Sequence, residues 1–440
     1  VLGFNQAILN MKKIFLLRFV FIFFIFMLLL PEASAQRIVT IHKAKKQETI
    51  FGISKKYNVT IEALQDANPM MREKDFILKK GMMINIPEPT TSDKISLKQT
   101  NQITVGVMLP LHDINGDGKR MVEYYRGILL ALNDLKSEGY NVTLNTWNVA
   151  EDTDIRNTLL DNNAKNCDII FGPLYTKQVT LLANFCVTNS IRLVIPFSIS
   201  GTDVQTCPMI YQIYQSPYDI MQTSIQQFTS LFKDTHPVFI DCNDISSSKG
   251  VFTMSLRKKI EEKKIKYNIT NINNDLTTFA KAFDLSKRNV VVLNTARSPE
   301  LGKVFKKLDE LTILHPSVNI SIFGYNEWFM YTKVYGDKMR KYDTYIPSTY
   351  DYNEASAGIQ TFEHKYNMYY KTPMQQAIPR FAITGYDHMM YFVKGISMYG
   401  KKFHGKKSQN CHKPLQTPLH FERIGNGGYQ NRTYMFIRFR

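Results

Sequence analysis

The chain has 440 residues, which at about 100–200 residues per domain corresponds to about two to four domains. Apolar residues make up 44% of it and charged residues 21%, which excludes a disordered chain, and five cysteines exclude a disulfide-rich scaffold. Lysine and arginine exceed aspartate and glutamate by 55 − 38 = 17. Such an excess suits an anionic partner, whether nucleic acid, an anionic glycan or a membrane surface.

Residues 1–36 are predicted to be a signal peptide that starts at Met11. Phe19–Leu30 is an unbroken apolar run, and Ala33–Ala35 has the small-x-small pattern that signal peptidase cleaves. The run is shorter than the roughly 20 residues that span a bilayer, although a retained single-span anchor is the alternative. We therefore expect an exported, periplasmic protein with no membrane span after cleavage. Export also argues against nucleic acid as a partner.

Residues 37–88 are predicted to form a small module of a strand, two short helices and a second strand, with a marginal core. The predicted strands are Arg37–His42 and Met83–Ile86, and the predicted helices are Glu48–Tyr57 and Thr60–Asn68. Pro87 and Pro89 cannot continue a strand ladder, so they end the module. Residues 89–101 are polar without a clear period, which is typical of a linker.

This module contains, in order, the short motifs Gln47-Glu48-Thr49-Ile50, Tyr57, Val59-Thr60, Asn68-Pro69 and Ile86-Pro87. The order of these motifs resembles the LysM family. The resemblance implies binding to a glycan that contains N-acetylglucosamine, here peptidoglycan. The residues that it implies at the glycan are Glu48, Thr49, Ile50, Asn68, Pro69 and Met70. A structural role, which can coexist with glycan binding, is that Thr49 caps the first helix and Asn68 ends the second.

Residues 102–440 alternate strand and helix patterns, which favours an α/β fold with doubly wound parallel sheets in two lobes. The predicted strands are Ile103–Leu109, Val142–Val149, Asp168–Phe171, Arg192–Ile195, Pro237–Asp241, Asn289–Asn294 and Val318–Phe323. The predicted helices include Thr176–Thr188, Ile220–Phe232, Lys249–Lys264, Leu276–Leu285, Glu300–Leu311, Glu354–Tyr370 and Phe381–Tyr399. Leu419–Ile424 and Tyr429–Phe439 flank a glycine-rich turn and predict a hairpin.

This segment contains the motifs Leu109-Pro110-Leu111, Gly127–Asn133, Asp168–Pro173, Ile195–Ser198 and Phe381–Phe392. They resemble motifs of type I periplasmic binding proteins, the branched-chain amino acid receptor family, which includes activators of peptidoglycan synthases. The resemblance implies two lobes that close over a ligand by a hinge motion.

Ligands of open α/β sheets bind outside the carboxyl ends of the strands, so the candidate ligand-binding residues are taken from these ends. They are Pro110, Leu111, Gly172, Pro173, Tyr175, Thr176, Ser198, Ser200, Tyr325 and Glu327. Thr176 opens a helix whose free amides attract a carboxylate. The resemblance assigns Ser198 and Ser200 to the ligand carboxylate and Glu327 to its amino group. Alternatively, these are capping and turn residues, and Tyr175 either stacks on a different ligand or fills the cleft.

Two clusters with metal-ligand residue types are predicted not to bind metal. The residues that follow Asp113 resemble a calcium loop but carry Tyr124 at the twelfth position, where a bidentate glutamate is required. The spacing of His404, Cys411, His412 and His420 matches no zinc pattern, and lysines surround them, which favours a solvated basic loop.

The chain lacks nucleophile motifs and a phosphate-binding glycine-rich loop, so we expect no catalytic residues, no cofactor and no metal. The sequence predicts a cell-wall-associated binding protein, not an enzyme. One hypothesis is that it binds a small amino acid-like or peptide solute in an interlobe cleft and hands it to an ABC transporter. The alternative is a non-catalytic scaffold that regulates peptidoglycan synthesis by docking proteins such as a synthase.

Overall fold

The computed structural model describes residues 38–45, 48–57, 59, 61–73, 76–87, 102–197 and 201–440. They fall into two units, one that ends at Pro87 and one that begins at Gln102. The predicted signal peptide, the predicted linker, Ser198 and Ser200 lie outside the described residues. Within the described ranges, no helix combines the length and the apolar character that crossing a membrane requires.

The N-terminal unit is a two-stranded antiparallel sheet with two short helices, as predicted. Its elements are β1 (Ile38–Lys43), α2 (Ile50–Tyr57), α3 (Ile61–Ala67), the 3-10 helix η1 (Pro69–Arg72) and β2 (Met83–Pro87). Apolar side chains from all four main elements or their flanks form its core, and those less than 5% exposed include Ala44, Ile50, Ile53, Ile61, Leu64, Ile84 and Ile86. The core is small, as expected for a module of about fifty residues.

The first lobe of the C-terminal unit is built on a seven-stranded sheet with the strand order β13-β14-β7-β6-β5-β3-β4. The strands are β3 (Ile103–Leu109), β4 (Val142–Asn148), β5 (Ile169–Phe171), β6 (Arg192–Ile195), β7 (Ile210–Gln212), β13 (Phe421–Arg423) and β14 (Tyr429–Asn431). All neighbours are parallel except β13 and β14. The mostly parallel, doubly wound sheet that the sequence predicted is confirmed.

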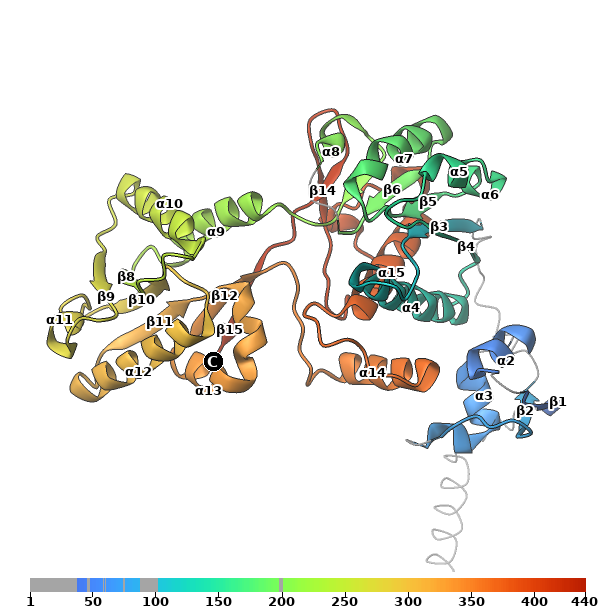
Figure 1. Ribbon diagram of the computed structural model, residues 1–440, viewed down its shortest axis with the longest axis horizontal. Helices are drawn as coiled ribbons and strands as arrows, with labels where there is room; N and C mark the ends of the chain where they lie inside the picture. The colour runs from blue at the N-terminus through green and yellow to red at the C-terminus, as the bar shows by residue number, and fades with distance from the viewer. Residues whose placement is uncertain are drawn as a thin grey trace, which may run out of the picture. The chain divides into compact units, whose positions relative to one another are not determined.

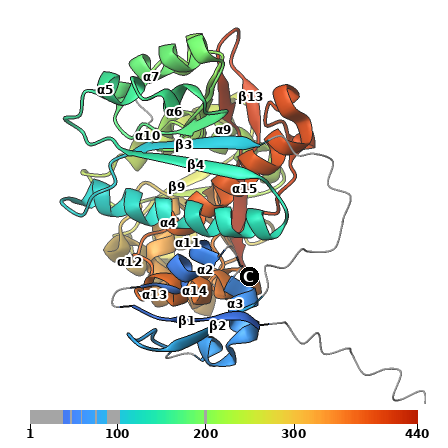
Figure 2. The same cartoon turned by 90° about the vertical axis from the view of Figure 1, so that its right-hand side faces the viewer.

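Helices cover both faces of this sheet (Figure 2). The helices of this lobe are α4 (Gly116–Ser137), α5 (Ile155–Leu159), α6 (Asn162–Lys165), α7 (Thr176–Asn189), α8 (Asp203–Thr206), α14 (Ala357–Tyr370), α15 (Phe381–Tyr399) and the 3-10 helices η3 (Gly400–Lys402) and η4 (Lys407–Gln409). Of these, α14 packs on α4 and α15 rather than on the sheet. Because strand side chains alternate, Val107 and Leu109 pack in the cluster with α4 and α15, whereas Met108 packs in the cluster with α5 to α8. Both faces are therefore buried, which explains why the strands are continuous apolar runs.

The second lobe has a six-stranded sheet with the order β15-β12-β11-β10-β8-β9 and its own helices (Figure 1). The strands are β8 (His236–Asp241), β9 (Asn268–Asn271), β10 (Arg288–Leu293), β11 (Asn319–Phe323), β12 (Thr344–Ser348) and β15 (Met435–Phe439). The helices are α9 (Pro217–Leu231), α10 (Lys249–Glu262), α11 (Leu276–Ala280), α12 (Ser298–Leu314), α13 (Thr332–Lys341) and the 3-10 helix η2 (Asn326–Tyr331). Only β15 runs antiparallel to its neighbour.

The chain passes from one sheet to the other three times, through residues 213–216, 349–356 and 432–434. The first and third passages are tied together, since the Gln215 side chain donates to the Thr433 carbonyl at 2.6 Å. The hairpin predicted at the C-terminus is confirmed for β13 and β14. Its second arm was predicted to run unbroken to Phe439, and this is wrong, because residues 435–439 pair with β12 in the other sheet.

Candidate functional site

In the N-terminal unit, Glu48 and Thr49 lie between β1 and α2 and hold this connection by hydrogen bonds. The His42 imidazole donates through Nε2 to the Glu48 carboxylate at 2.8 Å, because a carboxylate only accepts, and its Nδ1 is hydrogen-bonded to the Tyr57 hydroxyl at 2.9 Å. The Lys45 amide also donates to Glu48, and these two bonds lower the pKa of the Glu48 carboxyl. The Thr49 hydroxyl accepts from the Gly52 amide at 3.0 Å, so the helix-capping role is present while Thr49 stays exposed.

The second predicted glycan-contacting segment, Asn68 to Met70, combines a buried anchor with an exposed tip. The Asn68 side chain, 3% exposed, donates to the carbonyls of Leu64 and Asn85 at 2.8 and 2.7 Å and accepts from the Asn85 amide at 2.8 Å. Pro69 and Met70, which begin η1, are exposed, whereas Ile50 is buried in the core. Asn68 and Ile50 therefore shape the loops from within.

In the first lobe, the predicted residues lie where β3 and β5 end and α7 begins. Pro110, Gly172 and Pro173 are buried, Leu111 is half-buried, and Tyr175 and Thr176 are partly exposed at the start of α7. The Tyr175 hydroxyl donates to the Asp117 carboxylate of α4 at 3.4 Å. Burial and the neighbouring Asp117 raise the pKa of Tyr175. The ring is thus fixed beside an acidic group at the carboxyl edge of the sheet.

In the second lobe, Tyr325 and Glu327 lie after β11, and both have internal partners. Tyr325 is 5% exposed and donates to the Leu293 carbonyl, so it is part of the core, and burial raises its pKa. Glu327 is half-exposed and accepts from the Lys249 ammonium at 2.6 Å. That ammonium lies 4.8 Å from the centre of the Tyr325 ring. Glu327, Lys249 and Tyr325 are therefore one cluster, which Lys249 joins from the start of α10.

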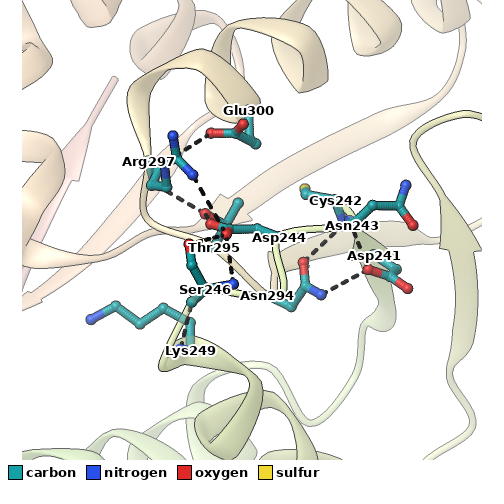
Figure 3. A network of polar contacts seen from close by, with 11 residues as sticks. Asp241, Cys242, Asn243, Asp244, Ser246, Lys249, Asn294, Thr295, Arg297 and Glu300 are labelled. Atoms are coloured by element: carbon teal, nitrogen blue, oxygen red, sulfur yellow. Dashed lines mark hydrogen bonds and ion pairs between the residues drawn. The ribbon is translucent and has the colours of Figure 1, made fainter.

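A polar network lies at the carboxyl ends of β8 and β10 (Figure 3). It lies beside the cluster of Glu327, Lys249 and Tyr325, of which Lys249 begins α10. The Asp244 carboxylate, 3% exposed, accepts from the hydroxyls of Thr295 and Ser246, each at 2.7 Å. These two bonds lower the pKa of the Asp244 carboxyl. The exposed Arg297 guanidinium lies 3.7 Å from both Asp244 and Glu300. The network is thus a rigid, buried acid with an exposed cation above it.

The other half of the network joins the two strand ends themselves. The Asn294 amide group accepts from the Cys242 backbone amide at 2.9 Å and donates to the Asp241 carboxylate at 2.8 Å. Figure 3 shows Asn294 directed toward both residues. Chemically, the edge offers hydrogen-bonding groups and both signs of charge, which suits binding of a zwitterionic or polar ligand.

Residues 42–87 match the model of the LysM domain family. This segment is a LysM domain. No curated protein matches the chain in sequence. The match lies inside the predicted module of residues 37–88, and it includes the exposed Thr49 and Met70.

The C-terminal unit is similar to solved periplasmic binding proteins. A protein assigned to branched-chain amino acid ABC transport from Rhodospirillum rubrum is 12% identical, covers 77% of this chain and 96% of its own, and has a TM-score of 0.51. A branched-chain amino acid ABC transporter periplasmic ligand-binding protein from Burkholderia xenovorans is 13% identical, with coverages of 77% and 90% and a TM-score of 0.45. The C-domain of LpoA from Haemophilus influenzae, a regulator of PBP1A, is 12% identical, with coverages of 77% and 97% and a TM-score of 0.46. The C-terminal unit has the type I periplasmic binding protein fold.

Sequence reasoning missed Asp244 and Lys249, which the structure adds to the second-lobe edge, because the residues that follow the predicted strand Pro237–Asp241 were not searched. Residues Asn294–Arg297 were among the strand ends considered, but Arg297 was not chosen as a candidate. The predicted residues of this lobe were Tyr325 and Glu327, and the structure places Lys249 against both. Of the first-lobe residues, Ser198 and Ser200 are not described.

The five cysteines and His412 contact other parts of the protein. All five cysteines are free thiols, and Cys186 is fully buried in α7, where burial raises its pKa. The loop around His412 is not wholly solvated as predicted, because His412 is nearly buried and contacts the Asp387 carboxylate at 3.1 Å. Within the described ranges, no group of three or more His, Cys, Asp or Glu residues is placed to hold a metal ion. Asn115 of the calcium-like segment caps α4 by accepting from Gly118.

Proposed function

We propose that this protein is exported and held on peptidoglycan by its LysM domain, and that its C-terminal domain binds a small amino acid-like or peptide solute between its lobes. The observation that carries the proposal is the presence of a LysM domain and a type I periplasmic binding protein fold in one chain. The first module supplies attachment to the wall, and the second supplies a non-catalytic receptor. An ABC transporter is the partner that this function implies.

The exposure of the LysM loops supports glycan binding by a subset of the predicted residues. Thr49, Pro69 and Met70 are exposed, so they are accessible to a sugar, and Met70 can cover the acetamide methyl. Ile50 and Asn68 are buried, and their contribution is to hold the loop backbones in place. The backbone around Glu48 supplies the hydrogen bonds to the acetamide.

The carboxyl edges of both sheets support solute binding in the C-terminal domain. The amides at the start of α7, near Tyr175 and Thr176, favour a carboxylate. Glu327 is the acid for an amino group, and a ligand ammonium would take the place that Lys249 now holds. Arg297 is exposed and has only long contacts to carboxylates, so it is a second group available to the ligand.

A second candidate function is a scaffold that regulates peptidoglycan synthesis by docking proteins, with an empty cleft. The observation that favours it is that the acids of the second-lobe edge are already satisfied, Glu327 by Lys249 and Asp244 by Thr295 and Ser246. A receptor that binds a cationic ligand group gains no affinity for it when the acid that would contact this group is already paired with a lysine of the protein. A peptidoglycan synthase is the partner for this function.

Two measurements on the full chain test the proposal. Cosedimentation with insoluble sacculi tests wall attachment, and we expect Met70→Asp to weaken it. Thermal unfolding in the presence of amino acids and muropeptides tests solute binding, and we expect one of them to raise the melting temperature by several degrees. Glu327→Gln should reduce that shift, whereas Asp234→Asn should not, because Asp234 is exposed and precedes β8 at the opposite end of the sheet.

The outcomes separate the two functions. A solute response that Glu327→Gln reduces and Asp234→Asn does not supports the receptor. No response to any solute, together with retention of a peptidoglycan synthase on the immobilised protein, supports the scaffold. Failure to sediment with sacculi contradicts wall attachment for both.

A further inference from the structure

A pocket at β13, the edge strand of the first-lobe sheet, is lined mainly by basic side chains. Its volume is about 590 Å³, and the basic residues that line it are His404, Lys406, Lys407, His420 and Arg423. They come from the loop after η3 and from the hairpin of β13 and β14. Small-molecule sites have volumes of roughly 300–1,000 Å³, so this pocket is large enough for an organic ligand rather than a bare ion.

The positive charge of the pocket exceeds its negative charge, because Glu422 is the one acid among the residues that line it. No ion pair among the described residues involves Lys406, Lys407 or Arg423. The Glu422 carboxylate lies 3.9 Å from the guanidinium of Arg432, a residue that is not part of the lining. Arg423 is held in place, because its guanidinium donates to the carbonyls of Gly427 and Asn426, both at 3.1 Å. A fixed guanidinium together with two ammonium groups that have no ion pair within the described ranges favours an anion.

Two imidazoles add further donors and a flat surface. The Tyr211 ring stacks on Tyr429 with centroids 4.8 Å apart, and Tyr429 stacks on His404 at 5.4 Å. His404 ends this stack and lines the pocket. His404 bonds the Tyr429 hydroxyl through Nδ1, and His420 bonds Thr433 through Nδ1. The Nε2 atoms have no hydrogen-bond partner among the described residues.

The electrostatic surroundings of these imidazoles fit an anion site. Burial lowers the pKa of His404, and Lys406 and Arg423 lower it further. Burial also lowers the pKa of His420; the neighbouring Glu422 opposes this shift, whereas Lys407 and Arg432 add to it. A bound anion would offset the repulsion from these cations and would favour protonation of both rings.

We propose that this pocket binds a small organic molecule that carries a phosphate monoester. The dianionic phosphate takes hydrogen bonds from Lys406, Lys407 and Arg423, and it gains more from several cationic donors than a single carboxylate does. The organic part lies against the His404 end of the ring stack. The site is formed within the first lobe, and it does not depend on the solute or scaffold function proposed above.

Calorimetric titration of the full chain with glucose 6-phosphate tests this proposal. We expect saturable binding that weakens with salt, because the contacts are charged and partly exposed. The double variant Lys406→Gln/Lys407→Gln should weaken binding at least tenfold. The control is Lys401→Gln/Lys402→Gln, which changes the net charge equally at exposed lysines outside the lining. It should weaken binding less than twofold.

Four results would overturn the proposal. They are no binding of glucose 6-phosphate, equal loss in both double variants, binding of glucose as tightly as of its phosphate ester, and preference for citrate over the ester. Inorganic phosphate that binds as tightly as glucose 6-phosphate would overturn the organic part. Both lysine pairs are exposed, so the variants should unfold at the same temperature as the parent.

Discussion

Substitution of Gly127 by alanine tests the helix pair that completes the first lobe. Gly127 lies on α4 against α15, and a Cβ there would lie 1.8 Å from the Ala382 carbonyl oxygen. Gly385 on α15 has the reciprocal contact, since its Cβ would lie 2.0 Å from the Tyr124 carbonyl oxygen. Cβ atoms essentially never approach other atoms closer than 3.0 Å. Relief of the clash at Gly127 therefore requires a shift of about 1.2 Å, the difference between 3.0 and 1.8 Å.

The size of the expected loss in the free energy of unfolding follows from the atoms that face Gly127. The obstructing atoms are backbone, so no side chain can rotate away, and the shift must separate the two helices around buried residues such as Tyr124, Ile128 and Phe392. Overpacking of a core typically costs about 1–3 kcal/mol, and this case belongs at the upper end. Alanine is better than glycine in a helix by about 0.5–1 kcal/mol. We expect a net loss of about 2 kcal/mol or more in the free energy of unfolding.

Guanidinium unfolding of the full chain, followed by tryptophan fluorescence, measures this loss. The chain has two tryptophans, Trp147 on β4 in the first lobe and Trp328 on η2 in the second, so the Trp147 transition reports on the affected lobe. The control is Gly250→Ala on α10, where nothing lies within 4 Å of the added Cβ and we expect a gain of up to about 1 kcal/mol. Equal midpoints for Gly127→Ala and the parent would refute the close approach of α4 and α15.

Three further substitutions have expected outcomes. Asn68→Ala leaves the Asn85 backbone unpaired and should destabilise the LysM domain by about 1–3 kcal/mol in thermal unfolding, with weaker sacculus binding as a consequence. Asp387→Ala removes the acceptor of three backbone amides in residues 415–417, and chemical unfolding should show a loss of about 3 kcal/mol or more. Burial lowers the pKa of His388 from 6.5 to about 3, so below pH 6.5 the unfolded chain binds a proton that the folded chain does not. Stability should therefore fall by about 2 kcal/mol between pH 7 and pH 5, and His388→Gln should flatten this slope in pH-dependent unfolding.

The long buried elements could be predicted from the sequence because many of their residues carry the same periodic apolar pattern. The strand Ile103–Leu109 and the helix Phe381–Tyr399 have the predicted bounds, since their apolar runs are long and end in turn residues. The strand β7 escaped prediction because its three residues include the polar Gln212, whereas the equally short β5 is wholly apolar. The strand β12 was missed because it contains Pro347, which is typical of edges rather than of sheet interiors, and it lies between β11 and the antiparallel β15.

The path of the last strand could not be derived from local pattern. Residues 429–431 and 435–439 both have strand-like composition, and the short connection between them carries no glycine or proline. Only pairing partners far away in the sequence separate the two, Tyr211 for Tyr429 and Tyr345 for Arg438. Local propensity thus predicted a strand, and tertiary pairing decided which sheet it joins.

The positions of the candidate residues in the fold could be predicted from the sequence, but their polar partners could not. The described residues lie at the carboxyl ends of their strands, which are known once the strands are known, and ligand binding at this edge stays a prediction. The partner of Glu327 is 78 residues away, and that of Asp244, Thr295, is 51 residues away. Ion pairs and hydrogen bonds between residues so far apart in the chain cannot be recognised in a single sequence.

The Lys249–Glu327 pair does not by itself decide between receptor and scaffold. Its lysine side chain is 23% exposed and its glutamate 44% exposed, and such half-exposed pairs contribute about 0–1 kcal/mol. An incoming ammonium that replaces Lys249 forms a pair of the same kind, so the exchange is close to neutral and changes affinity by less than about tenfold. Affinity for a solute must therefore come from the apolar and hydrogen-bonding contacts of both edges rather than from this charge. A receptor would consequently tolerate Glu327→Gln with weakened but measurable solute binding, whereas a scaffold would show no solute binding in either form.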